Sequence, residues 1–252
     1  MLKREVPISL VDAHCHVDLY TSYEDVLADS DAADVRVLAV TTTPHAYTGN
    51  LKRFGQHRQV VVALGIHPQI VGTKHADLSV FDSHLSTAVA VGEVGLDGSA
   101  RYTDTYAEQQ NVFSHVVRAC ADAGGRPMTV HSLRAVRRVL ELMRENDANC
   151  VNRYALHWFT GSTDELRAAI DFGCFFSVNQ AMTKSRRGLQ LLALAPSARV
   201  FTETDGPFIL DGRRPLVPSG VAKVTADIAN AWNVDFDSAR QTIAQNFQRF
   251  LG

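Results

Sequence analysis

Eight short apolar runs, each followed by a stretch long enough for an amphipathic helix, constrain the fold of this chain more than any other feature. The runs are rich in Val, Leu and Ala and cover about residues 8–13, 35–43, 60–66, 88–94, 127–131, 154–159, 174–179 and 200–204. This alternation favours parallel strands joined by crossover helices. Eight such units predict an α/β fold, a (β/α)8 TIM barrel, in which active sites form at the C-terminal ends of the strands.

Helices are clearest over residues 105–123, 163–172, 218–232 and 236–250, and Ser162 or Thr163 can cap the second of them. An open doubly wound sheet shows the same alternation and also binds ligands at strand C-termini. The chain lacks a G-x-G-x-x-G turn after its first strand, which weakens that alternative. Because no linker or low-complexity segment divides the sequence, we expect one barrel domain over residues 1–252.

The net charge of −2 provides no general attraction for nucleic acid, so a polyanion would have to be held by local basic groups or by metal ions. The four cysteines form no C-x-x-C pair and suit a reducing compartment. The first residues lack the apolar core of a signal peptide, and the apolar runs are too short to span a bilayer. We therefore expect a cytoplasmic protein with free thiols and no membrane segment.

Imidazole or carboxylate groups stand at the ends of five of the predicted strands. Because side chains alternate along a strand, His14 and His16 point to one side and Cys15 to the other. The other strand ends carry Glu93, His131, His157 and Asp205. Any one of these six is most simply a core histidine or a structural carboxylate, but buried carboxylates need partners. Six on five strand ends predict a two-metal centre with open positions for water.

Basic residues follow the strands near residues 131, 178 and 204, where a phosphate backbone would pass. The candidate phosphate contacts are Arg134, Lys184, Arg186, Arg187, Arg213 and Arg214. Arginine binds phosphate through two parallel hydrogen bonds, so such a rim could guide a DNA end toward the metals. Arg137 and Arg138, farther along their helix, are more simply explained as solvated helix residues.

An ordered set of motifs resembles the TatD family of metal-dependent deoxyribonucleases, within the metal-dependent hydrolase superfamily of TIM barrels. The motifs are DAHCHVD at 12–18, GIHP at 65–68, VGEVGLD at 91–97, TVHS at 129–132, HWFTGS at 157–162, FSVN at 176–179, ETDGPF at 203–208 and NFQRFLG from 246. Some are loose individually, but the ordered set is specific and runs nearly from end to end.

The resemblance implies that His14 and His16 bind one metal ion, that Glu93 bridges two ions, and that His131 and His157 bind the second. It also implies Asp205 as a metal ligand that handles the proton. Two divalent ions about 4 Å apart lower the pKa of a bridging water and hold the leaving oxygen in line. A carboxylate beside two cations stays ionised, which makes it a natural general base.

Further roles follow from the same resemblance. It places His67 near the scissile phosphate, with a structural turn histidine beside Pro68 as the alternative, and Glu203 as an acid beside the metals. Gln109 with Phe113 matches a helix position that packs against the barrel.

Three positions depart from the family pattern. Leu133 stands where the family usually has arginine, with Arg134 next to it, and Arg213-Arg214-Pro215 replaces an Asn-Glu-Pro motif. The residues that contact phosphate in this chain therefore need not lie at the family's usual positions. Trp158 replaces the usual cysteine, and it either stacks on a base or packs under its loop, with packing favoured.

For function, the resemblance implies hydrolysis of DNA from a 3′ end, more readily from a single-stranded end, with two divalent ions such as zinc, manganese or magnesium. The segments HCHVDLY, VTTTP at 40–44 and LHWFTGS are similar to the corresponding segments of the TatD-like nuclease of bacterial Qat anti-phage systems. That similarity implies a role in phage defence beside other Qat proteins. The alternatives are a metal-dependent hydrolase of a small ester, amide or lactone, and a non-enzymatic scaffold of a defence complex.

Overall fold

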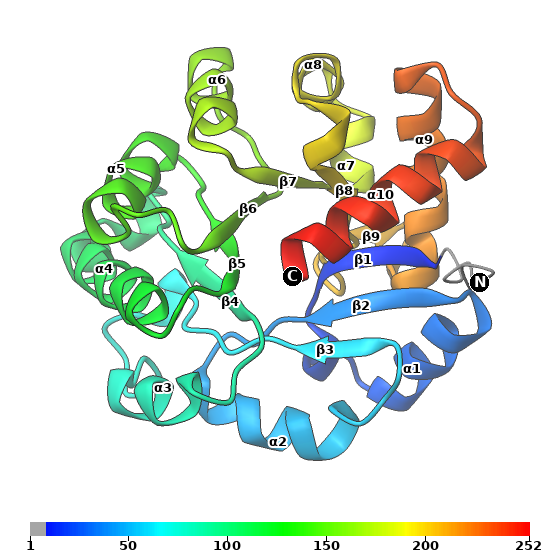
Figure 1. Ribbon diagram of the computed structural model, residues 1–252. Helices are drawn as coiled ribbons and strands as arrows, with labels where there is room; N and C mark the ends of the chain where they lie inside the picture. Colours follow the sequence, from blue (N-terminus) through cyan, green and yellow to red (C-terminus); the bar gives the residue numbers. More distant parts are fainter. Residues whose placement is uncertain (1–8) are drawn as a thin grey trace, which may run out of the picture.

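Each of the eight predicted apolar runs overlaps a β-strand in the computed structural model, which describes residues 9–252. The strands are β1 (Leu10–Cys15), β2 (Val35–Ala39), β3 (Val60–Val62), β4 (Val91–Gly95), β5 (Pro127–His131), β6 (Arg153–His157), β7 (Phe175–Val178) and β8 (Val200–Thr202). Position 8 of the first predicted run lies outside the described residues. Figure 1 shows the strands as a ring with the helices outside it, which confirms the predicted barrel.

The ring closes through different contacts at its two seams. The order β1-β2-β3 and the order β4-β5-β6-β7-β8 are both parallel, and a bridge between Leu64 and Val91 joins the two groups. On the other side, the Asp205 amide donates to the His14 carbonyl at 2.9 Å, and the Thr202 hydroxyl donates to the Val11 carbonyl. Contacts at both seams exclude the open doubly wound sheet.

The described part of the chain has ten α-helices, which pack around the ring or, for the last of them, across its end. They are α1 (Tyr23–Ala32), α2 (Pro44–Phe54), α3 (Leu78–Leu85), α4 (Tyr106–Asp122), α5 (Val136–Asn146), α6 (Thr163–Phe172), α7 (Gln180–Thr183), α8 (Arg186–Leu194), α9 (Val221–Trp232) and α10 (Phe236–Leu251). Short 3-10 turns add η1 (Val17–Leu19), η2 (Pro68–Ile70), η3 (Ala100–Thr105), η4 (Ser197–Arg199) and η5 (Pro218–Gly220). None of the helices within residues 9–252 is long and apolar enough to cross a membrane.

The predicted helices have clear local causes. α6 covers the predicted range 163–172, and Ser162 caps it in a capping box with Glu165. α9 begins at Val221, three residues later than predicted, because Pro218–Gly220 forms a 3-10 turn first. The end of α6 is set by Gly173 at φ 102°, a left-handed conformation that glycine adopts without steric cost.

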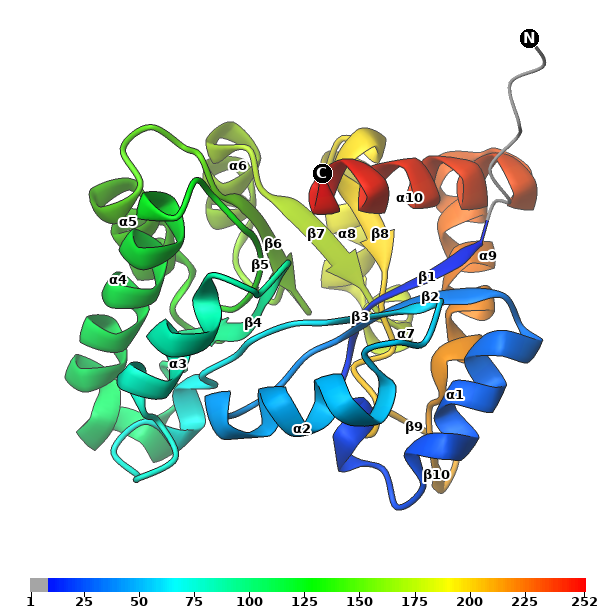
Figure 2. The ribbon, with the colours of Figure 1, turned by 60° about the horizontal axis from the view of Figure 1, so that its bottom comes forward.

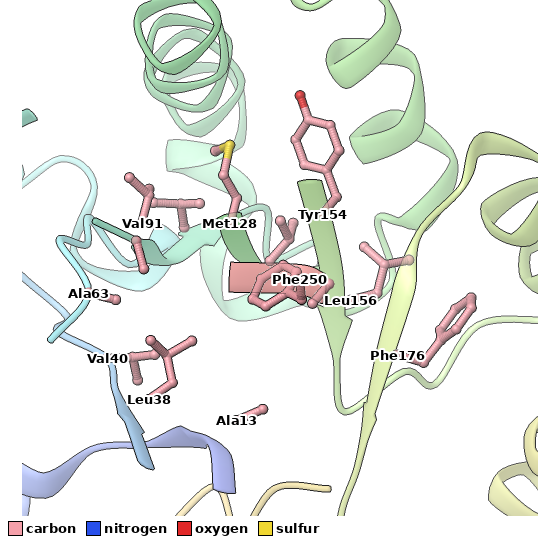
Figure 3. Close-up of a cluster of buried hydrophobic side chains, with 14 of the residues drawn as sticks. Ala13, Leu38, Val40, Ala63, Val91, Met128, Tyr154, Leu156, Phe176 and Phe250 are labelled. Carbon is pink, nitrogen blue, oxygen red and sulfur yellow. The ribbon is translucent and has the colours of Figure 1, made fainter. Parts of the chain in front are cut away.

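Helix α10 crosses the barrel at the end where the strands begin, as Figure 2 shows. Its Phe250 ring lies 5.4 Å from the Phe201 ring, and Figure 3 shows Phe250 among the side chains of the strands. The Asn246 side chain donates to the Val200 carbonyl at 2.6 Å, and Arg153 Nε donates to the Phe250 carbonyl at 2.5 Å. This end of the barrel is therefore packed shut, which leaves the opposite end for a site.

A small antiparallel hairpin was not predicted. It consists of β9 (Leu210–Asp211) and β10 (Arg214–Pro215), which follow β8 and lie at the end of the barrel opposite α10 (Figure 2). With two exposed residues a strand, it has no apolar alternation for sequence reasoning to detect.

Candidate metal centre

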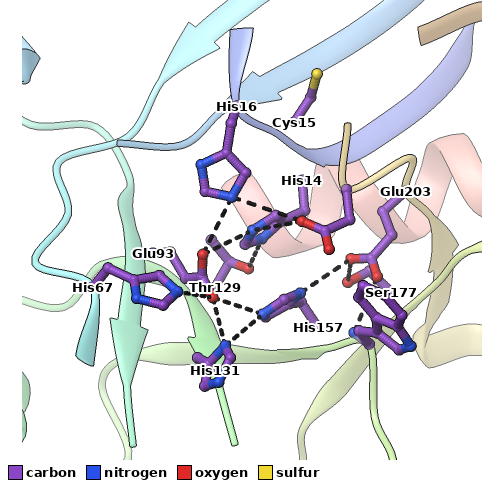
Figure 4. Close-up of polar contacts among 12 residues, drawn as sticks. His14, Cys15, His16, His67, Glu93, Thr129, His131, His157, Ser177 and Glu203 are labelled. Atoms are coloured by element: carbon purple, nitrogen blue, oxygen red, sulfur yellow. Dashed lines mark hydrogen bonds and ion pairs between the residues drawn. The ribbon is translucent and has the colours of Figure 1, made fainter. Parts of the chain in front are cut away.

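The six predicted metal ligands come together at the C-terminal end of the barrel. The side chains come from β1 and the residue after it, from β4, from the last residues of β5 and β6, and from the loop after β8. They are His14, His16, Glu93, His131, His157 and Asp205. Figure 4 shows the imidazoles arranged around Glu93, with Cys15 pointing away from them as side-chain alternation predicts. A cluster of this kind is typical of a metal site.

One oxygen of Glu93 faces the two histidines of the β1 end. His14 Nε2 and His16 Nε2 lie 3.4 and 3.3 Å from Glu93 Oε2, and 3.8 and 3.7 Å from Asp205 Oδ1. Donor atoms of His14, His16 and Asp205 all lie within 4.8 Å of one another. His14 Nε2 is buried and has no hydrogen-bond partner among residues 9–252. These donors fit a divalent cation, which would satisfy that atom.

The opposite nitrogen of His14 is held by strand β5. His14 Nδ1 lies 2.8 Å from the Thr129 hydroxyl, so a proton on Nδ1 leaves the Nε2 lone pair free for a cation. Burial, together with the charge of His157, lowers the pKa of His14 well below its ordinary value. The ring is therefore neutral, the form in which imidazole binds metal ions.

The other oxygen of Glu93 faces three imidazoles. His131 Nδ1 and His157 Nε2 each lie 2.8 Å from Glu93 Oε1, and the two nitrogens are 3.4 Å apart. His67 Nε2 lies 3.1 Å from the same oxygen. Glu93 thus stands between two groups of histidines, which is the position a bridging carboxylate requires.

His67 differs from the other histidines in the state of its ring. Its Nδ1 accepts a hydrogen bond from the Gln69 amide at 3.1 Å, which caps the η2 turn. Burial lowers the pKa of His67, so the ring is neutral and its proton sits on Nε2, facing Glu93. His67 therefore forms the turn and also points a donor into the site, and its predicted place near a scissile phosphate stays a prediction.

The site holds more buried carboxylate than its histidines neutralise. Burial opposes ionisation of Glu93, but His67, His157 and His131 together hold its pKa well below the ordinary value. Burial and then the charge of Glu93 raise the pKa of Asp205 well above its ordinary value. A bound cation reverses such a shift by stabilising the ionised form.

Asp97 is a site residue that sequence reasoning missed. Its Oδ2 lies 3.2 Å from His131 Nε2 and accepts from the Gln69 side chain at 2.8 Å. Although burial opposes it, the paired carboxylates Asp97 and Glu93 raise the pKa of His131 to about 9. Asp97 therefore fixes the orientation of His131, and its place in the VGEVGLD motif was the available signal.

Gln109, the predicted packing residue of α4, completes this support. Its side-chain oxygen accepts from the Asp97 amide at 2.8 Å, and Phe113 one turn later is buried in the core. Gly95, at φ 134°, lies so close to β5 that a Cβ there would be 2.1 Å from the His131 carbonyl oxygen. The close approach of β4 and β5 therefore requires glycine at this position.

Two further buried acids hold the β1 and β8 ends. Asp12, which sequence reasoning also left without a role, accepts from the Thr204 amide and hydroxyl at 2.8 and 2.5 Å. Glu203 accepts from the Ser177 hydroxyl and from the Trp158 amide, the latter at 3.0 Å. Its Oε2 lies 3.9 Å from His157 Nδ1, so Glu203 stands beside the cluster as predicted.

A pocket of about 360 Å³ opens directly onto the cluster. Besides the histidines, its walls include Leu133, Trp158, Thr160 and Phe208. Trp158 is only partly buried, so it packs against the core and also lines the pocket. This mouth is more apolar than the predicted basic rim.

The predicted phosphate contacts do not line this pocket. Arg134, Lys184, Arg186 and Arg213 are all exposed. Lys184 Nζ lies 2.7 Å from the Gln180 side-chain amide, whose oxygen can accept a hydrogen bond from it. Arg186 and Arg187 line a neighbouring hollow that shares Trp158 with the pocket.

Arg138 pairs with Glu141 and Glu145 at 3.1 Å, in agreement with its reading as a solvated helix residue.

Comparison with known proteins places the chain among nucleases and hydrolases. A family model described as TatD related DNase matches residues 11–252. The uncharacterized metal-dependent hydrolase YcfH of Escherichia coli is 30% identical over 260 residues, 96% of this chain and 95% of that protein. The 3′-5′ ssDNA/RNA exonuclease TatD of Citrobacter rodentium is 29% identical over 195 residues, 75% of this chain and 73% of that protein.

A solved structure shares the fold. The crystal structure of YJJV, a TatD homologue from Escherichia coli K12, superposes with a TM-score of 0.86 at 22% identity. The match covers 96% of this chain and 97% of that one.

Metal binding is expected to stabilise the folded protein. Adding Mn²⁺ to chelator-treated protein at about 100 times its Kd contributes about 2.7 kcal/mol, or roughly 5–10 °C in Tm for a chain of this size. Asp205→Asn removes one predicted ligand and should reduce this shift by at least about half. Thermal unfolding with and without Mn²⁺ measures both. Asp82→Asn, which changes a surface pair with His115, is the matched control; equal shifts in all three proteins would contradict the site.

Proposed function

The chain belongs to the TatD-related DNase family, and on this basis we propose that it removes nucleotides from the 3′ end of single-stranded DNA. The observation that carries the proposal is the buried carboxylate of Glu93, which faces five imidazoles at the floor of an open pocket. Neither a structural core nor a simple binding surface needs this arrangement, whereas metal-dependent hydrolysis uses it, and the family points to a phosphodiester as the substrate.

We assign the metal ligands as two groups around one bridge. His14, His16 and Asp205 would hold one ion, His131 and His157 would hold the second, and Glu93 would bridge them. Mixed imidazole and carboxylate donors suit zinc or manganese, and magnesium is the third candidate. The bound ions would supply Lewis acidity to the phosphate and a water of lowered pKa.

Two side chains of the pocket would handle protons and charge. Asp205 lies at the pocket wall with its carboxylate toward the β1 histidines, and we assign it as the general base. His67 presents a proton on Nε2 to the same space, so it is suited to donate to a phosphate oxygen rather than to bind a metal ion. Glu203 and Asp97 would act by positioning His157 and His131.

A single strand is the better substrate for this pocket. Its walls combine the polar cluster with Leu133, Trp158 and Phe208, which suits a sugar or an unstacked base beside the phosphate. The Citrobacter rodentium relative is named a 3′-5′ ssDNA/RNA exonuclease, and this supports the same polarity here.

We expect the protein to shorten a 5′-labelled single-stranded oligonucleotide from its 3′ end when Mn²⁺ is present. EDTA should abolish the reaction, and Asp205→Asn should reduce the rate by about 10²- to 10⁴-fold, the usual contribution of a general base. Gel electrophoresis of the products measures rate and polarity, and Asp82→Asn should behave as the unsubstituted protein.

Intact DNA in every lane, from protein shown to hold two metal ions, would rule out the nuclease. Ester, amide and lactone substrates would then be tested as the alternative. Release of the 5′ label first would rule out the 3′ polarity alone.

We also propose that the nuclease serves in phage defence, in the cytoplasm and beside other proteins of a Qat system. This role is supported by the sequence segments HCHVDLY, VTTTP and LHWFTGS within the shared family motifs. In cells that express the chain with its Qat partners, Asp205→Asn should raise the number of phage plaques toward that of cells without the system, because turnover falls about 10²- to 10⁴-fold. Equal plaque numbers for the two proteins would contradict this role.

A further inference from the structure

The metal pocket adjoins a second hollow. Trp158 and Thr160 line the pocket that contains Glu93, and the same two residues line a hollow against α7 and α8. We call this hollow the arginine groove. Its residues include Trp158, Thr160, Ala181, Ser185, Arg186 and Arg187. A DNA strand that leaves the metal centre in this direction would pass over the Trp158 side chain.

Trp158 is held in place at this junction. Its backbone amide donates to Glu203 Oε1 at 3.0 Å, and its φ of 39° puts it in the left-handed region. Because it is partly buried and packs against the core, the indole is anchored while part of it lines both hollows. An anchored indole is a suitable platform for stacking a nucleobase.

The arginine groove carries uncompensated positive charge. Within residues 9–252, no carboxylate oxygen lies within 4.0 Å of the Arg186 or Arg187 guanidinium, whereas Arg167 pairs with Asp164. Arg187 Nη1 donates to the Thr160 carbonyl at 3.0 Å, which ties α8 to the rim of the pocket. Arg186 is exposed and makes no such bond, so it is the freer of the two to bind an anion.

The other predicted phosphate contacts lack this connection to the metal centre. Arg213 lies beside the exposed turn of the β9–β10 hairpin, and Arg134 follows Leu133 at the mouth. Neither lines the metal pocket or the arginine groove.

From this continuity and charge, we propose that the DNA strand next to the scissile phosphate leaves the metal pocket over Trp158 and along the arginine groove. A base stacks on the indole of Trp158, and a backbone phosphate binds Arg186. The proposal rests on the nuclease function proposed above. It assigns the strand path and stacking to Trp158 and Arg186, neither of which is among the metal ligands assigned above.

The test measures DNA affinity in a background that does not cut. Fluorescence anisotropy follows a labelled single-stranded oligonucleotide of about ten nucleotides, within the range of common site sizes, binding to Mn²⁺-loaded Asp205→Asn protein. Arg186→Gln should weaken binding about 5- to 10-fold and lower the slope of log Kd against log salt by about one. Arg167→Gln, which also removes one exposed helical arginine, is the matched control and should leave Kd within about twofold.

Trp158 is tested with two variants because it also packs against the core. Trp158→Leu keeps an apolar side chain but removes the ring, and it should weaken binding at least about fivefold. Trp158→Phe should recover most of the DNA affinity lost in Trp158→Leu. A side chain that only packs against the core would not need an aromatic ring for this. Metal content is measured in both, and a loss of affinity that follows a loss of metal would overturn the stacking role.

The outcomes separate this proposal from the nuclease function. If the protein cuts DNA but Arg213→Gln weakens binding more than Arg186→Gln, or Arg186→Gln matches Arg167→Gln, then the strand path is wrong and the nuclease stands. If the unsubstituted protein neither cuts nor binds DNA, then both fail.

Discussion

A buried carboxylate surrounded by imidazoles is the interaction on which this structure depends. Glu93 is only 2% exposed, and an unpaired carboxylate in such a place costs several kcal/mol. Five histidine nitrogens lie within 3.4 Å of its two oxygens, and His67, His157 and His131 lower its pKa. They reach it because parallel strands in a barrel bring their C-terminal ends to one rim. The histidine cluster around Glu93 therefore depends on the closure of the barrel, and α10 packs the opposite end.

The layer outside the histidines connects the site to the closure of the barrel. Asp12 accepts from the Thr204 amide and hydroxyl, and it also lies 3.4 Å from the His14 amide. The same carboxylate thus joins β1 to the end of β8 and places a metal-site histidine. Asp97 positions the histidine at the end of β5 in the same way, because its carboxylate contacts His131 Nε2. Such outer contacts set which nitrogen of each imidazole faces the centre, and they tune a metal site as strongly as many direct ligands do.

The barrel and the convergence of the six cluster residues could be predicted from the sequence alone, because strand alternation and strand ends are local patterns. Asp97 was missed because its partner, His131, is 34 residues away and only the fold joins them. The β9–β10 hairpin was missed because its strands are two residues long and exposed. Lys184 was predicted as a phosphate contact from its place after β7, which stays a prediction, and its contact with the Gln180 side chain could not be read from the sequence. The positions of residues on strands could be predicted from the sequence. The directions of long side chains could not, because they depend on neighbours that the sequence does not show.

The central claim is that Glu93 bridges two metal ions, and anomalous diffraction from crystals soaked in Mn²⁺ tests it most directly. We expect two anomalous peaks on either side of the Glu93 carboxylate, one beside His14 and His16 and the other beside His131 and His157. A single peak, or peaks away from Glu93, would contradict the claim. In that case the cluster of imidazoles would need another explanation, and so would the nuclease chemistry built on it.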